Sequence, residues 1–249
     1  KNFSPPADQL FFDAIPEATF EKTACRDWYV QGFTRAEVAT YENSGMATGA
    51  TMVASVLEYK RTGDAKVLER IRRLFRGIRR ICEVGATFEP GFITKYYGAR
   101  FTYETSNDQC LYLAYGMDAY YELAQPDERS FIEKQIPAIA SFWMRHNYTY
   151  SYFEYTNMVW PPLRFPALLM IAWKYSGDKA FKDEADRIMR ENIDCVPEFA
   201  MIPRYRNRRY SDYEEKHNIR YFHNMADSVT MDTMHLTLLL RCDPQSEFA

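Results

Sequence analysis

The chain has 249 residues, and its 47% hydrophobic and 26% charged residues are typical of a globular protein with a large core. A formal net charge of −3 gives no overall attraction to nucleic acid or to an anionic membrane. No apolar run approaches the roughly 20 residues that span a bilayer, so we expect neither a nucleic-acid nor a membrane partner.

The cysteines and histidines do not have metal-binding spacing. No C-x-x-C pair is present, and Cys82 and Cys110 lie in helical patterns where buried, inert thiols are expected. His217, His223 and His235 do not share one helical face. We therefore expect no metal and no cofactor. The sequence leaves the oligomeric state open and does not settle the compartment, with a secreted or periplasmic location slightly favoured over a cytoplasmic one.

Residues 1–40 are the least regular part of the chain. Ser4-Pro5-Pro6 predicts an extended lead-in. The segment around Trp28 mixes charged and aromatic residues, which fits either a terminal segment packed onto the domain or the rim of a pocket.

A helical hairpin is predicted at about residues 44–84. Met46 to Tyr59 has small residues on several faces and no consistently polar side, so we expect this helix to be buried all round. Gly63 fits a left-handed helix C-terminus, and Asp64 is a good N-cap for an amphipathic second helix. That helix carries a row of arginines, which we interpret as a solvated outer face.

The same plan recurs along the chain. Hairpins are predicted at about 106–147 and 156–195, and a partial one at 224–249. Pro126 and Asp127 begin the second amphipathic helix, Asp178 caps the third, and Pro137 is expected to kink its helix or mark a restart.

Each apolar helix follows a polar turn. The turns begin at Glu42, Glu104, Glu154 and, more loosely, His223. Alternating apolar and amphipathic helices predict an inner layer covered by an outer one, and inner helices that run parallel bring their N-termini to one mouth. Backbone N–H groups at such N-termini favour anionic or oriented polar ligands.

These residues resemble the six-hairpin glycosidase-like, or (α/α)6-toroid, superfamily. The Tyr59–Asp64 and Tyr175–Asp178 junctions carry the resemblance, with Asn43-Ser44-Gly45-Met46, Pro90-Gly91-Phe92 and Thr105-Ser106-Asn107-Asp108-Gln109. The last three segments are similar to a group of uncharacterised bacterial toroid proteins. The resemblance implies an all-α fold, with residues 1–249 as a single α/α toroid domain. Six hairpins at this spacing need more chain, so a partial chain, absent segments and an open arc all remain possible.

The resemblance to unsaturated-glucuronyl hydrolases implies a glycoside hydrolase acting on oligosaccharides that contain uronic or unsaturated uronic acid. Asp108 would then be the general acid/base, with Glu42 or Glu104 as its partner. Those enzymes have Asp at both turns, and this chain has Glu42-Asn43 at the first. Capping of a helix is the alternative role for Asp108 and Glu104. The expected substrate-binding residues are Trp28, Asn43, Tyr96, Tyr97, Arg100, Tyr103, Gln109, Tyr155, Trp160 and Arg164.

Two other functions fit the same residues. A polysaccharide lyase would use Asn107 or Arg100 to neutralise a carboxylate, with Tyr97 or His146 as the base. A non-catalytic sugar-binding toroid protein would explain the aromatic loops without a carboxylate pair.

Overall fold

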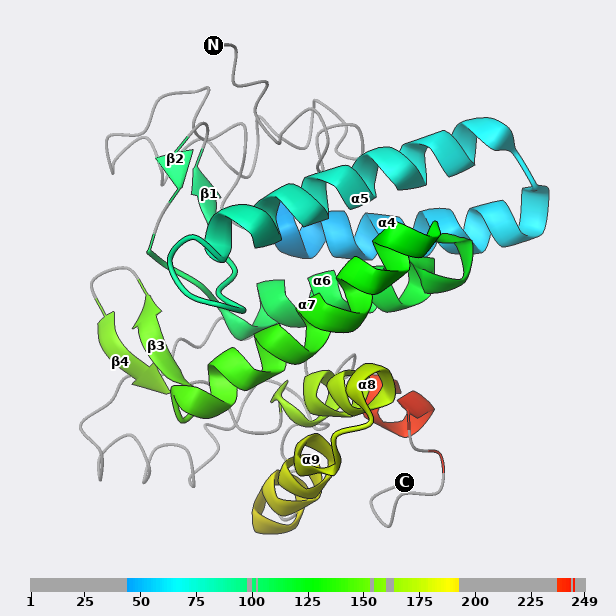
Figure 1. The fold of residues 1–249 in the computed structure, drawn as a ribbon. Coiled ribbons are helices and arrows are strands. Elements are labelled where there is room, and N and C mark those ends of the chain that lie inside the picture. The colour runs from blue at the N-terminus through cyan, green and yellow to red at the C-terminus, as the bar shows by residue number, and fades with distance from the viewer. Residues whose placement is uncertain are drawn as a thin grey trace, which may run out of the picture. The chain divides into compact units, whose positions relative to one another are not determined.

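The computed structural model describes residues 44–97, 100–101, 103–152, 155–159, 164–192, 237–242 and 244. The described chain is mostly helical, with a few short strands (Figure 1). This confirms the all-α class. The chain divides into two compact units, Lys1–Ile132 and Glu133–Ala249, and the boundary falls inside one helix. The predicted lead-in and most of the partial hairpin at 224–249 lie outside the described residues.

The first unit contains the predicted first hairpin. Helix α4 (Ser44–Thr62) is joined to α5 (Ala65–Gly85) by a two-residue turn. Gly63 has a φ of 66°, the left-handed conformation that glycine adopts without steric cost. The side chain of Asp64 accepts a hydrogen bond of 2.8 Å from the backbone N–H of Lys66. Both junction predictions are therefore confirmed.

The second hairpin consists of α6 (Asn107–Tyr120), the 3-10 turn η3 (Tyr121–Leu123) and α7 (Pro126–Arg145). Pro126 occupies the first turn of α7, where a missing N–H costs nothing. The carboxylate of Glu128 accepts hydrogen bonds from the backbone N–H of Gln125 at 2.8 Å and from the hydroxyl of Tyr120 at 2.7 Å. Helix α7 runs through Pro137 without ending there.

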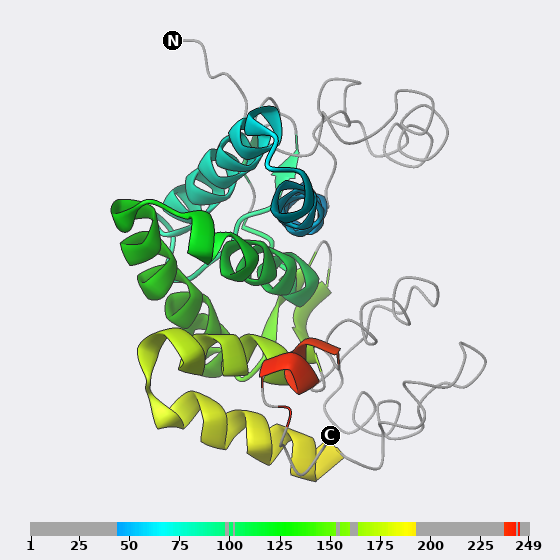
Figure 2. The same cartoon turned by 90° about the vertical axis from the view of Figure 1, so that its right-hand side faces the viewer.

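Helices α4 and α6 run parallel and touch backbone to backbone. A Cβ atom built on Gly49 would lie 2.1 Å from the carbonyl oxygen of Tyr112, and one built on Gly116 would lie 3.0 Å from the Cα of Gly49. One built on Gly45 would lie 2.3 Å from Oε1 of Gln109. Residue numbers therefore rise together along both helices, and their N-termini lie at the same end. Figure 2 shows the two helices side by side.

The core of the first unit is centred on the apolar face of α5. The buried residues of this face are Val67, Ile71, Leu74, Phe75, Ile78 and Ile81. The ring of Phe75 contacts that of Tyr120 at 5.0 Å and that of Phe131 at 6.0 Å, so α5 packs on the end of α6 and the start of α7. On the opposite face of α5, Arg72, Arg76 and Arg80 are exposed, whereas Arg70, Arg73 and Arg79 are half-buried, so the predicted solvated face is present only in part.

One face of α4 differs from expectation. Ala50, Ala54 and Leu57 are exposed, with Leu57 at 63%. The prediction that this helix is buried all round is therefore wrong. Helix α4 packs on α5 and α6 through its other faces, and a sequence without a polar side does not reveal how many neighbours a helix has.

Two antiparallel hairpins interrupt the helices. Strands β1 (Tyr96–Tyr97) and β2 (Arg100–Phe101) pair in the first unit. Strands β3 (Thr149–Tyr152) and β4 (Tyr155–Val159) pair in the second, with an irregular register between Tyr150 and Tyr152.

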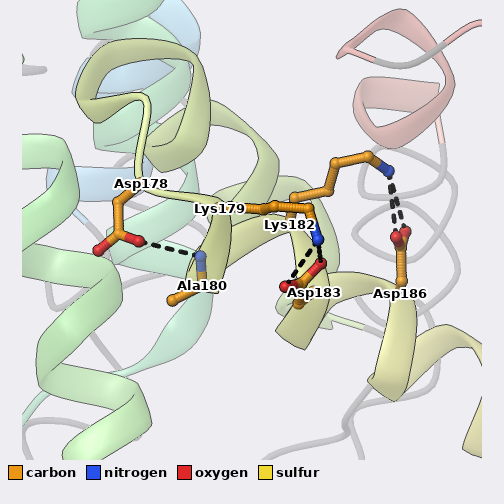
Figure 3. Close-up of polar contacts among 6 residues, drawn as sticks. All are labelled: Asp178, Lys179, Ala180, Lys182, Asp183 and Asp186. Atoms are coloured by element: carbon orange, nitrogen blue, oxygen red, sulfur yellow. Dashed lines mark hydrogen bonds and ion pairs between the residues drawn. The ribbon is translucent and has the colours of Figure 1, made fainter.

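The second unit contains the third hairpin, α8 (Pro166–Ser176) and α9 (Lys179–Asn192). Gly177 between them has a φ of 68°, and Oδ1 of Asp178 accepts a hydrogen bond of 2.9 Å from the N–H of Ala180 (Figure 3). Ion pairs four residues apart, Lys179–Asp183 and Lys182–Asp186, follow along α9. The predicted Asp178 cap is confirmed.

Helix α9 is also tied to the segment that follows α7. The hydroxyl of Tyr148 donates a hydrogen bond of 2.6 Å to Glu184, which also accepts hydrogen bonds from the guanidinium of Arg187. The pKa of Tyr148 is raised, mainly by burial and next by the hydrogen bond to Glu184. The pKa of Glu184 is lowered, mainly by the hydrogen bond from Arg187.

In the part of the chain that the structure describes, no helix has the length and hydropathy needed to cross a bilayer.

Candidate functional site: the N-terminus of α6

The start of α6 is both strongly polar and buried. Five consecutive polar residues are at most 8% exposed: Thr105, Ser106, Asn107, Asp108 and Gln109. Polar and charged residues are mostly found at the surface, so five buried in succession need an explanation. We call this segment the α6 polar cluster.

Several side-chain atoms of the α6 polar cluster have no hydrogen-bond partner among the described residues. They are Oγ of Ser106, both Oδ1 and Nδ2 of Asn107, and Oδ1 of Asp108. A buried polar atom left unpaired costs about 1–3 kcal/mol, so each such group in a folded protein calls for a specific reason. Ser106 occupies the N-cap position of α6, yet its side chain makes no capping bond. Capping therefore does not explain Ser106.

The backbone holds the α6 polar cluster in place. The N–H of Lys95 donates a hydrogen bond of 3.1 Å to the carbonyl of Glu104, and the N–H of Cys110 donates one of 3.3 Å to the carbonyl of Ser106. Thr105 lies 3.8 Å from the sulfur of Cys110 through its hydroxyl. The unpaired side chains therefore project from a segment whose backbone is fixed.

Helix geometry adds donors to this end of α6. The first N–H groups of an α-helix have no partner within the helix, and the helix dipole favours negative charge beside them. Because Gly45 lies against Gln109, the N-terminus of α4 is next to that of α6. The N-termini of these two apolar helices therefore lie together, because the helices run parallel.

Lys95 is a site residue that the sequence did not reveal. Lys95 and the preceding Thr94 are each 1% exposed. The backbone N–H of Lys95 donates a hydrogen bond to the carbonyl of Glu104. Lysine is almost never fully buried unless it is paired, and the backbone of Lys95 lies beside Glu104, the residue before the α6 polar cluster. The one signal in the sequence is a Thr-Lys pair directly after the apolar Phe92-Ile93.

The structure places the predicted site residues unevenly. Asp108, Gln109 and the half-buried Glu104 lie together in and beside the α6 polar cluster, and Tyr103 precedes them with 71% of its surface exposed. Tyr96, Tyr97 and Arg100 lie in the β1–β2 hairpin, and Tyr155 lies in β4. Arg164, 5% exposed, precedes the N-cap of α8 in the second unit. Trp28, Glu42, Asn43 and Trp160 lie outside the described residues.

The cysteines near this site are shielded from solvent by burial. Cys82 and Cys110 are buried and free of disulfides. The pKa of the Cys82 thiol is raised, mainly by burial and next by the neighbouring Cys110. Within the described ranges no group of three or more His, Cys, Asp or Glu residues is arranged to hold a metal ion. His146 packs its ring on Phe142 at 4.5 Å and Tyr150 at 5.3 Å.

The chemistry available at the start of α6 is that of polar recognition with a carboxyl group at hand. The Asn107 side chain offers two donors and an acceptor, the Ser106 hydroxyl offers one donor, and Asp108 offers a carboxyl oxygen.

No family model matches the sequence, and neither a curated protein nor a solved structure matches the chain.

Proposed function

We propose that this protein is a carbohydrate-active enzyme, a glycoside hydrolase whose substrate is an oligosaccharide containing uronic or unsaturated uronic acid. The α6 polar cluster is its binding site. The observation that carries the proposal is the set of unpaired atoms on Ser106, Asn107 and Asp108. A sugar ring presents several hydroxyl groups that both donate and accept hydrogen bonds, and it is therefore a suitable partner for an amide, a hydroxyl and a carboxyl group side by side.

In this mechanism Asp108 is the general acid/base. Glycoside hydrolysis needs a carboxylic acid that protonates the leaving oxygen, and a second carboxylate that activates water or attacks the sugar. Glu104 or Glu42 is the proposed second group. Asn107 and Ser106 would bind the sugar hydroxyls, and the positive end of α6 would favour the uronate carboxylate.

The toroid architecture is part of the proposal. Support comes from the parallel α4 and α6, whose N-termini lie together, and from the recurrence of the hairpin with its Gly-Asp junction at Asp64 and Asp178.

A polysaccharide lyase is the second candidate, and the unpaired Asn107 amide is the observation that favours it. β-Elimination needs a group that neutralises the uronate carboxylate while a base removes the neighbouring proton. The Asn107 Nδ2 donors suit the first task, with Tyr97 as the base.

The test is an activity screen with saturated and unsaturated uronate oligosaccharides, comparing the wild type with Asp108→Asn. Hydrolysis of an unsaturated uronide removes its ultraviolet absorbance, whereas β-elimination of a saturated chain creates it. We expect loss of absorbance with the wild type and a reduction of about 10²–10⁴-fold in Asp108→Asn. Asp64→Asn is the matched control, since Asn also caps helices well. Full activity in Asp108→Asn would refute the proposed role, and binding without any turnover would identify a sugar-binding protein.

A further inference from the structure

The two exposed aromatic side chains of the described region touch each other. The described side chains include four large exposed hydrophobic ones, and the aromatic two are Phe88 at 40% and Tyr103 at 71%. Their ring centroids lie 4.7 Å apart with an interplanar angle of 62°. Other large aromatic side chains, such as Phe75, Phe92 and Trp143, are at most 1% exposed. Among the aromatic side chains whose burial the structure describes, this pair is therefore unusual in its exposure.

The turn that carries Phe88 packs against a buried ring and is hydrogen-bonded to the end of α5. The ring of Phe88 stands edge-on to that of the buried Phe92, with centroids 5.8 Å apart. The N–H of Phe88 donates to the carbonyl of Gly85 at 2.9 Å, and that of Phe92 donates to Glu89 at 3.0 Å. A Cβ built on Gly85 would lie 1.9 Å from the carbonyl oxygen of Phe92, so this turn folds tightly back on the end of α5.

The pair also lies close to the α6 polar cluster along the chain. Tyr103 is four residues before Asn107, and four extended residues span at most about 14 Å. The buried, unpaired groups of Asn107 and Asp108 and the exposed rings are therefore no farther apart than the length of a short oligosaccharide.

We infer that Phe88 and Tyr103 form a stacking platform for a second sugar of the oligosaccharide whose first sugar occupies the α6 polar cluster. The inference rests on the proposed function and specifies it further: the ligand is a chain of at least two pyranose rings. The apolar C–H face of a pyranose covers exposed aromatic surface, while its hydroxyl groups stay in water or bind polar side chains. The backbone of the turn that carries Phe88 is hydrogen-bonded without a ligand, which limits the conformational entropy that this turn loses on binding.

The experiment uses a size series of unsaturated galacturonate oligosaccharides, from two to five units, with the full chain. Phe88→Ala and Tyr103→Ala are compared with Tyr103→Phe, which keeps the ring, and Phe88→Leu, which keeps the apolar bulk. Leu57→Ala is the matched control, because Leu57 is also an exposed apolar side chain, with 63% of its surface exposed, and it lies on α4 and not in the Phe88–Tyr103 pair. Circular dichroism checks that each variant is folded, and Kd and KM are measured for every length.

We expect Phe88→Ala and Tyr103→Ala to weaken binding of the longer members by about five- to tenfold, as for loss of one aromatic contact. Binding of the shortest member stays within twofold, Tyr103→Phe behaves as the wild type, and Leu57→Ala has no effect. Phe88→Leu shows the same loss as Phe88→Ala, since it lacks the ring.

Other results separate the two proposals. If the wild type cleaves the series and Phe88→Ala and Tyr103→Ala bind every length as the wild type does, the platform is wrong and the proposed function stands. If these variants weaken binding of the longer members but the wild type forms no product, the platform stands and the hydrolase is wrong. If no member of the series binds, both are wrong.

Discussion

Removing the Asn107 amide should leave the protein at least as stable as before, which is the opposite of what a structural polar group would do. Asn107 is 1% exposed, and neither its Oδ1 nor its Nδ2 has a hydrogen-bond partner among the described residues. Asn107→Ala removes a desolvation cost of about 1–3 kcal/mol. Asn107 is the first residue of α6, so the higher helix propensity of Ala adds less than the about 0.7 kcal/mol expected in a helix interior. The lost packing of a short side chain opposes these gains, so we expect a change in unfolding free energy between zero and about +2 kcal/mol.

The comparison is with polar groups at helix N-termini that do have partners. Asp64 and Asp178 each accept a hydrogen bond from the helix they cap, at 2.8 and 2.9 Å. Asp64→Ala and Asp178→Ala should therefore each destabilise the protein by about 1 kcal/mol. Urea denaturation followed by circular dichroism measures all three variants under one set of conditions.

The same variant must lose the ligand. In a thermal-shift assay with an unsaturated galacturonate oligosaccharide, the wild type should gain stability by mass action and Asn107→Ala should gain much less. A loss of 1 kcal/mol or more in Asn107→Ala without ligand, equal to that of the cap variants, would show that the amide is structural and would refute the reasoning.

Two further variants test the packing and the electrostatics. Gly49→Ala should destabilise by about 1–3 kcal/mol in urea denaturation, because its Cβ would lie 2.1 Å from the Tyr112 carbonyl oxygen; the stabilisation of about 1 kcal/mol usual for Gly→Ala within a helix would contradict the close approach of α4 and α6. Glu184→Gln should destabilise by about 1 kcal/mol at pH 7, since it loses the Arg187 ion pair and keeps an acceptor for Tyr148. Because the folded pKa of Glu184 is lowered, this stabilisation is present above the unfolded pKa near 4.3 and is lost as the pH falls through the folded pKa. A difference between wild type and Glu184→Gln that is equal at pH 7 and pH 3 would refute the assignment.

The hairpin junctions could be predicted because their signals are local. A glycine that must adopt a positive φ, followed by an aspartate that bonds two residues ahead, is complete within four residues, as at Gly63 and Asp64. The buried rows of α5 and α9 were likewise predictable from their spacing.

Features that depend on tertiary neighbours could not be predicted. The exposure of Ala50 and Leu57 depends on how many helices surround α4, and the burial of Lys95 depends on the chain packed around it, which includes Glu104. The resemblance predicted Asp108 as the general acid/base, and helix capping was the alternative role for it. That Ser106 caps nothing and Asn107 is unpaired follows only from the folded positions of their neighbours.

The most direct test of the central claim follows the Asn107 side-chain amide by NMR during titration with an unsaturated galacturonate oligosaccharide. If the ligand supplies the partner that the protein does not, the Asn107 Nδ2 proton resonances move downfield in step with binding, and Asn107→Ala removes those resonances and the affinity together. Saturable binding of the oligosaccharide with the Asn107 amide resonances unmoved would contradict the assignment of the α6 polar cluster as the ligand site.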